Sequence, residues 1–337
     1  MRLIGLVDSA EHVCCRYRLS AFRPYFERCG HSLHLCPWPR RWCAWPALAR
    51  LLSKADAVIL QRKLPARWQL ALLRRAARSL VFDFDDAVYG RDSYAAKGID
   101  CRRRRERFAA VCAASNHVIA GNTFLKRQAG RFADPSRVHI IPTCVDPERY
   151  SLAQHGRRGV GVQLVWLGSS STLRGLETIQ PILEKLGQHL PGIRLKLVCD
   201  RFFTVDHLRV DAVPWTEAGE AQELAAAAIG VSWMPDDDWS RGKCGLKVLQ
   251  YMAAGLPVIA NPVGVHSEMI RDAETGYLAA TPEQWLAAVA RLAGDSELRR
   301  RMGAAGRRRV EEDYSVERGA ALWSTVWDSL DQGRAAA

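Results

Sequence analysis

Residues 240–268 read SRGKCGLKVLQYMAAGLPVIANPVGVHSE. Glycines interrupt the start of this stretch, and the apolar residues that follow recur at helical spacing as far as Gly255, which is typical of a helix end. The next residues, Pro257–Ala260, form a short apolar run typical of a buried strand. The stretch therefore predicts a loop, a helix and a strand in succession, which is the repeating pattern of a parallel sheet covered by helices.

Short apolar runs alternate with longer amphipathic segments along the rest of the chain as well. In the first half, strands are predicted at Leu3–Val7, Leu33–Cys36, Ala57–Leu60, Leu80–Phe84, His117–Ala120 and Val138–Ile141. In the second half, strands are predicted at Gln163–Leu167, Leu195–Cys199, Val210–Val213, Ile229–Trp233, Pro257–Ala260 and Gly276–Leu278. The predicted fold class is therefore α/β, with two tandem Rossmann-like domains.

The periodicity is lost between residues 147 and 160, where the chain gains glycine and charge. We therefore predict a first domain at residues 1–150, a second at 151–313, and a C-terminal crossover helix with a tail at 314–337. Because open α/β sheets bind ligands at the carboxyl ends of their strands, we expect the strand ends of the two domains to face a cleft.

The net positive charge of the chain comes entirely from its first half. Residues 1–150 hold 27 Lys and Arg against 13 Asp and Glu, whereas residues 151–337 hold 21 against 23. The resulting charge of +14 on the first half attracts polyanions, an anionic membrane surface or an acidic substrate. The run Arg102–Arg105 fits such a contact, but a solvated helix face is the interpretation that we favour for it.

Composition narrows the class of protein further. No apolar run reaches the ~20 residues that span a bilayer, and the start of the chain is typical of a strand rather than a signal peptide. We therefore expect a cytoplasmic protein, with peripheral binding to the inner face of the membrane as an alternative. The ten cysteines include no Cys-x-x-Cys pair, so reduced thiols and no metal are expected. The sequence contains no recognised nucleic-acid-binding module, which argues against a nucleic-acid partner.

The glycine-containing loop Gly242–Gly245 opens the helix in the stretch quoted above. The first turn of a helix presents backbone N–H groups without intrahelical partners, and together with the helix dipole these groups bind anions. Lys243 and Lys247 are four residues apart, so we expect both on one side of this turn, beside a diphosphate. Gln250 lies one turn past Leu246 and offers a donor and an acceptor to sugar hydroxyls.

Several motifs together resemble one family. The residues MAAGLPVIA at 252–260, followed by Glu268 and by TGYL at 275–278, resemble the donor-binding core of retaining glycosyltransferases of family four. The segment 167–175, LGSSSTLRG, is similar to the Gly-Arg…Lys-Gly loop of that family, and RRRVEEDYS at 307–315 is similar to its closing segment. The resemblance is strong from residue 162 to 315 and weaker before 115.

This resemblance implies the two-domain GT-B architecture, a nucleotide-diphosphate sugar as donor substrate, no cofactor, no catalytic metal, and retention of the anomeric configuration. By position in the family's motifs, the donor would be bound by Gly168, Ser169, Trp215, Lys243, Gly245, Leu246 and Gln250. Arg174 and Lys247 would be catalytic, because they would stabilise the negative charge that develops on the leaving diphosphate. Trp215 would flank the base, and Gln250 would lie near the ribose.

The chain departs from the family at charged positions. The two glutamates of the family, eight positions apart, fall on Gly242 and Gln250, and the arginine of its first loop falls on Ser169. We interpret the chain as a variant subgroup that lacks the paired glutamates and uses Lys243 and Lys247 instead. Loss of activity is the alternative interpretation.

On the acceptor side, polar residues follow the predicted strands of the first domain. The candidates for binding the acceptor or a phosphate are Asp8, Arg16, Arg62, Asp85 and Asn122. Arg18, in the same Cys-Arg-Tyr-Arg run as Arg16, is a further candidate. Asp86 is the candidate general base for the acceptor hydroxyl. Helix capping and salt bridges to nearby arginines are the alternative interpretation of the two aspartates.

We therefore expect a glycosyltransferase that moves a sugar to a hydroxyl of a glycan or a lipid-linked glycan, with retention and without a metal. Two alternatives remain open. A nucleotide-sugar epimerase of the same fold would turn over the donor without an acceptor. A non-enzymatic polyanion-binding protein would show salt-sensitive binding that does not depend on nucleotide sugar.

Overall fold

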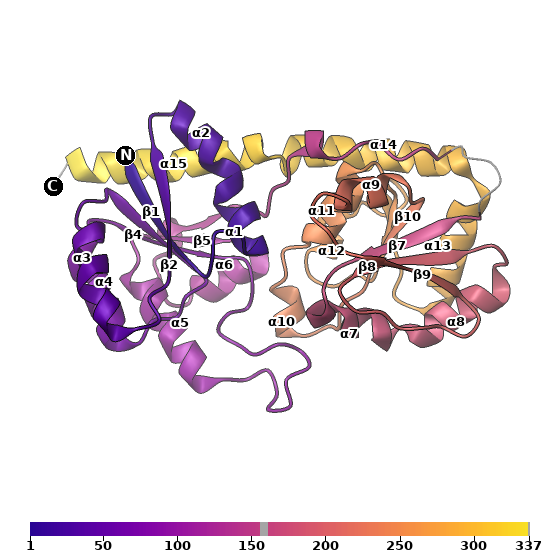
Figure 1. The fold of residues 1–337 in the computed structure, drawn as a ribbon, viewed down its shortest axis with the longest axis horizontal. Coiled ribbons are helices and arrows are strands. Elements are labelled where there is room, and N and C mark those ends of the chain that lie inside the picture. The colour runs from indigo at the N-terminus through magenta and orange to yellow at the C-terminus, as the bar shows by residue number, and fades with distance from the viewer. Residues whose placement is uncertain (156–160, 336–337) are drawn as a thin grey trace. The chain divides into compact units, whose positions relative to one another are not determined.

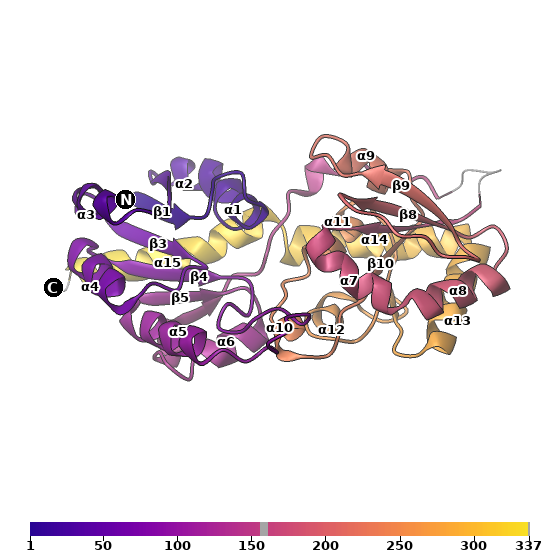
Figure 2. The ribbon, with the colours of Figure 1, turned by 60° about the horizontal axis from the view of Figure 1, so that its bottom comes forward.

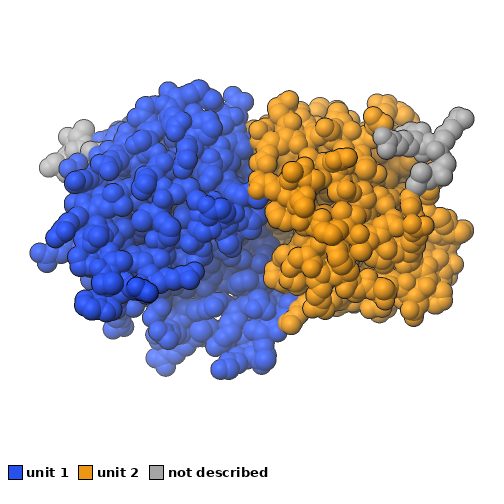
Figure 3. Space-filling view, viewed as in Figure 1, with its two compact units in different colours: residues 1–144, 237–244, 316–337 blue, residues 145–236, 245–315 orange. Residues whose placement is uncertain are grey.

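The structure is a computed structural model that describes residues 1–155 and 161–335. The chain divides into two compact units, which Figure 3 distinguishes by colour. Unit 1 contains residues 1–144, 237–244 and 316–337, and unit 2 contains residues 145–236 and 245–315. Residues 156–160, in the stretch predicted to link the domains, lie outside the described residues. Residues 237–244, which sequence analysis places in the second domain, group with unit 1.

Within the described residues, unit 1 is built on a six-stranded parallel sheet in the order β2-β1-β3-β4-β5-β6. Its strands are β1 (Arg2–Val7), β2 (Ser32–Pro37), β3 (Ala57–Gln61), β4 (Leu80–Phe84), β5 (His117–Ala120) and β6 (Val138–Ile140). Its helices are α1 (Val13–Arg18), α2 (Arg23–Arg28), α3 (Trp45–Leu52), α4 (Arg67–Ala76), α5 (Arg102–Ala114), α6 (Thr123–Ala129), α10 (Asp238–Arg241) and α15 (Val316–Ala335).

Alternating residues of these strands point to opposite faces and build two separate cores. In β3, Val58 and Leu60 pack with helices α3, α4, α5 and α6. Ala57 and Ile59 pack on the other face with α1, α2 and the C-terminal helix α15, whose Trp323 joins this core. Figures 1 and 2 show α15 along the sheet of unit 1. The predicted return of the C-terminal helix to the first domain is therefore confirmed.

Unit 2 repeats this architecture, with a six-stranded parallel sheet among the described residues in the order β12-β11-β10-β7-β8-β9. The strands are β7 (Gln163–Leu167), β8 (Arg194–Cys199), β9 (Arg209–Pro214), β10 (Ile229–Ser232), β11 (Val258–Ala260) and β12 (Gly276–Leu278). The helices are α7 (Ser170–Thr178), α8 (Gln180–His189), α9 (Glu220–Ala225), α11 (Leu246–Ala253), α12 (His266–Met269), α13 (Pro282–Gly294) and α14 (Ser296–Asp313).

Every predicted strand overlaps an observed strand, and both sheets are parallel, so the predicted fold class is confirmed. Each of the ten cysteines, all of them within the described residues, is a free thiol. No helix in the described part of the chain has both the length and the apolar character that crossing a membrane requires.

Candidate functional site

The carboxyl edge of the sheet in unit 1 collects most of the predicted acceptor-side residues. Asp8 follows β1, Arg62 follows β3, Asp85 and Asp86 follow β4, and Asn122 lies two residues after β5. Because these strands are parallel and each lies beside the next, their carboxyl ends share one edge.

Arg62 links several of these residues. Its Nη2 lies 2.6 Å from Oδ2 of Asp86, and its Nε lies 3.4 Å from Oδ1 of Asp85. Its Nη1 contacts the sulfur of Cys14. The backbone φ of Arg62 is 56°, a left-handed conformation that is unusual for a non-glycine residue and that clusters at functional sites. The backbone N–H of Arg62 donates to the carbonyl of Asp83 at 2.8 Å, which helps to hold this conformation.

Asp86 lies between two cations. Its Oδ2 accepts from Arg62 and also from Nζ of Lys243, at 3.0 Å, while its Oδ1 accepts from the backbone N–H of Ala87 at 3.1 Å. The residue is 6% exposed. This geometry matches the salt-bridge interpretation of the aspartates, and it makes Asp86 the residue that fixes both cations. The role of Asp86 as a general base remains a prediction.

Hydrogen bonds and close packing hold residues 237–244 against the same edge of the sheet. Nδ2 of Asn122 donates to the carbonyls of Lys243 at 2.9 Å and Arg241 at 3.3 Å, while its Oδ1 caps α6 by accepting from Leu125. We therefore assign Asn122 a positioning role. A Cβ added at Gly242 would lie 2.8 Å from Cβ of Ala87, so this arrangement has no room for the family's glutamate at position 242.

Two arginines of α1 differ in their surroundings. Arg18 is fully buried, forms an ion pair with Asp83, and donates from Nη1 to the carbonyl of Ile141 at 2.5 Å. The expectation that Arg18 binds a phosphate is therefore wrong, because its guanidinium is part of the core of unit 1 and does not reach solvent. Arg16 is half-buried and lies over the ring of Tyr17, 5.5 Å from its centroid.

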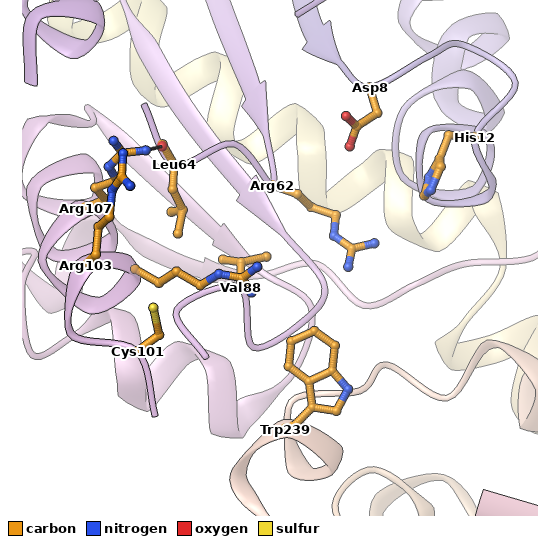
Figure 4. Close-up of a pocket in the computed structure, with 10 residues that line it drawn as sticks. Asp8, His12, Arg62, Leu64, Val88, Cys101, Arg103, Arg107 and Trp239 are labelled. Carbon is orange, nitrogen blue, oxygen red and sulfur yellow. Dashed lines mark hydrogen bonds between the residues drawn. The ribbon is translucent and has the colours of Figure 1, made fainter. Parts of the chain in front are cut away.

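A pocket of about 660 Å³ opens in unit 1 next to this edge. Arginines dominate its lining, and Figure 4 shows Arg62 between Asp8 and His12 on one side and Arg103 and Arg107 on the other. The remaining side chains of the lining are Leu64, Val88, Cys101, Arg104 and Trp239. Sequence analysis favoured a solvated helix face for residues 102–105, so it missed the part that this helix plays in the pocket.

In unit 2, the predicted diphosphate loop lies between β7 and α7. A Cβ added at Gly168 would lie 2.8 Å from Oγ1 of Thr172, so glycine permits this close turn. Ser169 is exposed at the N-cap of α7, with its backbone N–H 3.3 Å from Oγ1 of Thr172. Arg174 is exposed on α7.

Helix α11 begins at Leu246, after a left-handed Gly245 with φ of 62°. A Cβ on Gly245 would lie 2.6 Å from the sulfur of Met269, so only glycine fits there. Nζ of Lys247 lies 4.0 Å from the ring centroid of Trp166. Lys243 precedes the helix and groups with unit 1, so the spacing argument that put both lysines on one side of the first helical turn does not apply, because only Lys247 lies in the helix.

Gln250 is buried, and its amide is engaged by a carboxylate that sequence analysis did not single out. Its Nε2 donates to Oε1 of Glu220 at 2.5 Å and to the hydroxyl of Tyr150 at 3.3 Å. The other oxygen of Glu220 accepts from Nε1 of Trp215 at 2.9 Å. The predicted donor residues Trp215 and Gln250 are thus joined through Glu220. Sequence analysis could have identified Glu220 only from its position five residues after Trp215.

One segment of the chain matches a known family of proteins. Residues 238–309 match the family described as glycosyl transferases group 1. A search of curated protein sequences finds no match.

Solved structures share the fold across the whole chain. A sucrose-phosphate synthase from Thermosynechococcus elongatus is 15% identical, with a TM-score of 0.77 over 98% of this chain and 99% of that chain. HepE of Anabaena, solved with UDP and glucose, is 13% identical, with a TM-score of 0.72 over 98% and 100% of the two chains. A glycosyltransferase from Rickettsia africae is 12% identical, with a TM-score of 0.74 over 98% of each chain. The chain therefore has the GT-B fold that these solved structures share, and its residues 238–309 resemble the glycosyl transferases group 1 family.

Proposed function

We propose that this protein transfers a sugar from a nucleotide-diphosphate sugar to a hydroxyl of a glycan or lipid-linked glycan, with retention of anomeric configuration. The observation that carries the proposal is the start of α11, where left-handed Gly245 opens a helix inside the segment that matches the glycosyl transferases group 1 family. The complexes of HepE with UDP, glucose and UDP-glucose support a nucleotide sugar as the donor class.

The donor diphosphate would bind to backbone N–H groups and cations of unit 2. The first turn of α11 would present its backbone N–H groups to the diphosphate, and the glycine turn at Gly168 would let a phosphate approach the backbone closely. Lys247 and Arg174 would stabilise the charge that develops on the diphosphate as the glycosidic bond breaks. Lys247 is held over the face of Trp166, which favours a cation at that position.

The base and the ribose would lie beside Trp215 and Glu220. Trp215 is 40% exposed and its indole is fixed by the hydrogen bond to Glu220. A carboxylate accepts hydrogen bonds from two ribose hydroxyls better than a primary amide does. We therefore infer that Glu220 supplies the carboxylate that the family places at position 250, while Gln250 orients it.

Leaving-group stabilisation by Lys247 and Arg174 would also allow transfer without a metal. Excess chelator should leave the transfer rate unchanged in this proposal, and a loss of activity that Mg²⁺ restores would contradict it.

The proposal is tested by thermal-shift measurements with UDP, GDP, ADP and dTDP sugars, followed by a product assay with the sugar that stabilises the protein most. Binding of one nucleotide sugar raises the melting temperature by mass action. NMR of the product then reports the anomeric configuration. An inverted product would refute retention. Turnover of the donor into an epimer without acceptor would replace transfer with epimerisation, and the absence of any shift would refute a nucleotide-sugar donor.

A further inference from the structure

The pocket of unit 1 is lined by an excess of cations. Four arginines line it, namely Arg62, Arg103, Arg104 and Arg107, whereas Asp8 is its one carboxylate among the described residues. Asp8 itself forms an ion pair with Lys63. An excess of guanidinium groups around a concave surface favours an anionic ligand.

The arginines of α5 form two groups, one that lines the pocket and one that does not. Arg102 and Arg105 do not line it, and each forms an ion pair with an acid, with Glu106 and Asp100 respectively. For these two side chains, the interpretation of the run Arg102–Arg105 as a solvated helix face is correct.

Arg62 is paired with Asp85 and Asp86, but the three arginines of α5 that line the pocket have no carboxylate partner among the described residues. Arg107 donates from Nη1 to the carbonyl of Leu64 at 3.2 Å, and Arg104 donates to the carbonyl of Gly90. A carbonyl orients a guanidinium without neutralising it. In the part of the chain that the structure describes, the guanidinium of Arg103 has no hydrogen-bond or ion-pair partner. The planar fork of arginine matches the oxygens of a phosphate, so these groups suit phosphate in particular.

Cys101, which lines the same pocket, reports its electrostatic character. The backbone N–H of Arg104 lowers the pKa of the Cys101 thiol, and the charges of Arg91 and Arg104 lower it further. Of these groups, the guanidinium of Arg104 lines the pocket, and its charge favours an anion beside Cys101.

Three apolar side chains also line the pocket. Leu64, Val88 and Trp239 contribute to its lining. The indole of Trp239 is held by Lys243, whose Nζ lies 4.4 Å from the ring centroid. An aromatic face beside polar groups suits the ring of a sugar. The volume of about 660 Å³ is within the range of small-molecule sites.

We propose that this pocket binds the phosphate or diphosphate group of the acceptor, with Arg103, Arg104 and Arg107 as its ligands and Trp239 against the attached sugar. The identity of the bound molecule as the acceptor rests on the proposed function, whereas the anion site does not. The same group is presented by a soluble sugar phosphate and by a lipid diphosphate, and the experiments separate these sources.

Alkylation of Cys101 measures occupancy of the pocket without any transfer reaction. The protein is treated with iodoacetamide at matched ionic strength, with chloride, inorganic pyrophosphate, a hexose monophosphate or the unphosphorylated hexose, and modification is followed at each cysteine by mass spectrometry. At ten times its Kd, pyrophosphate or the hexose monophosphate should slow Cys101 roughly tenfold, because only the empty pocket reacts. Exposed Cys43, outside the pocket, should react at an unchanged rate.

Paired variants on one helix test the ligands. Arg103→Gln with Arg107→Gln should abolish the protection of Cys101, whereas Arg102→Gln with Arg105→Gln removes the same charge from the same helix and should preserve it. Circular dichroism checks that both variants are folded. Equal protection in the two variants, or no protection of the unaltered protein by any phosphate, would overturn the proposal.

Transfer assays then distinguish the source of the phosphate, and they test the anion site and the proposed function separately. Faster transfer to hexose monophosphate than to hexose supports a soluble acceptor, and transfer to a polyisoprenyl diphosphate in zwitterionic vesicles supports a lipid-linked one. Protection of Cys101 with no transfer would refute the proposed function and keep the anion site. Transfer to unphosphorylated sugar that is unaffected by Arg103→Gln with Arg107→Gln would refute the anion site and keep the function.

Discussion

Gln250 and Glu220 form a buried pair in unit 2, with Nε2 of the amide 2.5 Å from Oε1 of the carboxylate. The family places a glutamate where this chain has Gln250, and the tertiary structure brings a carboxylate from the start of α9 to the same point. A carboxyl group thus lies beside position 250, in the predicted donor site, although it comes from another position in the sequence.

Glu220→Gln should weaken binding of the nucleotide diphosphate by about tenfold, since a hydrogen bond to a charged group is worth roughly 1.5 to 3 kcal/mol. The exchange variant Glu220→Gln with Gln250→Glu restores one carboxylate and one amide, so it should recover part of the affinity. Isothermal titration gives each Kd in a double-mutant cycle. An unchanged Kd in Glu220→Gln would remove this residue from the donor site.

Lys247→Ala should reduce diphosphate binding and turnover together, because in the proposed function its ammonium group stabilises the leaving diphosphate. A loss of about 10² in kcat/KM is the expected scale for one electrostatic contact in the transition state. Lys185→Ala is the matched control, since it removes an exposed lysine of unit 2 that forms only a surface pair at 4.0 Å. Undiminished transfer by Lys247→Ala would refute its assigned role.

Asp86→Asn should reduce transfer and leave donor affinity unchanged. The substitution removes the negative charge that fixes Arg62 and Lys243, and these three side chains all belong to unit 1. Donor Kd and the KM for the acceptor are measured in parallel. A loss of donor affinity with normal acceptor KM would move Asp86 off the acceptor side.

Gly242→Ala should lower the free energy of unfolding by about 1 to 3 kcal/mol, the usual cost of overpacking. The new Cβ would lie 2.8 Å from Cβ of Ala87 and 2.9 Å from its backbone nitrogen. Gly294→Ala is the control, since no atom lies within 4 Å of its added Cβ. Urea denaturation measures both variants, and equal stability would contradict the packing argument.

His266 should make the protein less stable in acid. Its Nδ1 donates to the carbonyl of Asn261 at 2.9 Å and its Nε2 accepts from the hydroxyl of Ser232 at 3.0 Å, an arrangement of the neutral ring. Burial lowers the pKa of His266 to about 4 from 6.5. The unfolded chain therefore binds a proton between these values that the folded protein does not, so stability is present above pH 6.5 and is lost as the pH falls toward 4.

The contribution of this group is about 3 kcal/mol, from 1.36 kcal/mol per pKa unit. Urea unfolding at pH 7.5, 6 and 5 should show a smaller decrease in stability for His266→Gln than for the unaltered protein. His189→Gln, which replaces an exposed histidine, should keep the full decrease. A pH dependence that is the same in all three proteins would contradict the assignment to His266.

Local patterns were sufficient for the elements and the fold class. Runs such as Leu80–Phe84 and Gln163–Leu167 coincide with strands β4 and β7, because burial of a parallel strand on both faces requires an apolar run of that length. The glycine at position 245 predicted the start of a helix for a similar reason, since a left-handed conformation is a property of one residue and its neighbours.

Contacts between distant residues required the folded chain. Lys243 contacts Asp86, which lies 157 positions away in the sequence. Gln250 contacts Glu220, which lies 30 positions away. The periodicity of the sequence predicts neither contact. On α5, all four arginines at 102–105 look alike in sequence, and only packing decides which ones meet an acid and which ones line the pocket. Secondary structure follows from short-range sterics and burial, whereas a binding site is assembled from side chains that separate strands and loops bring together.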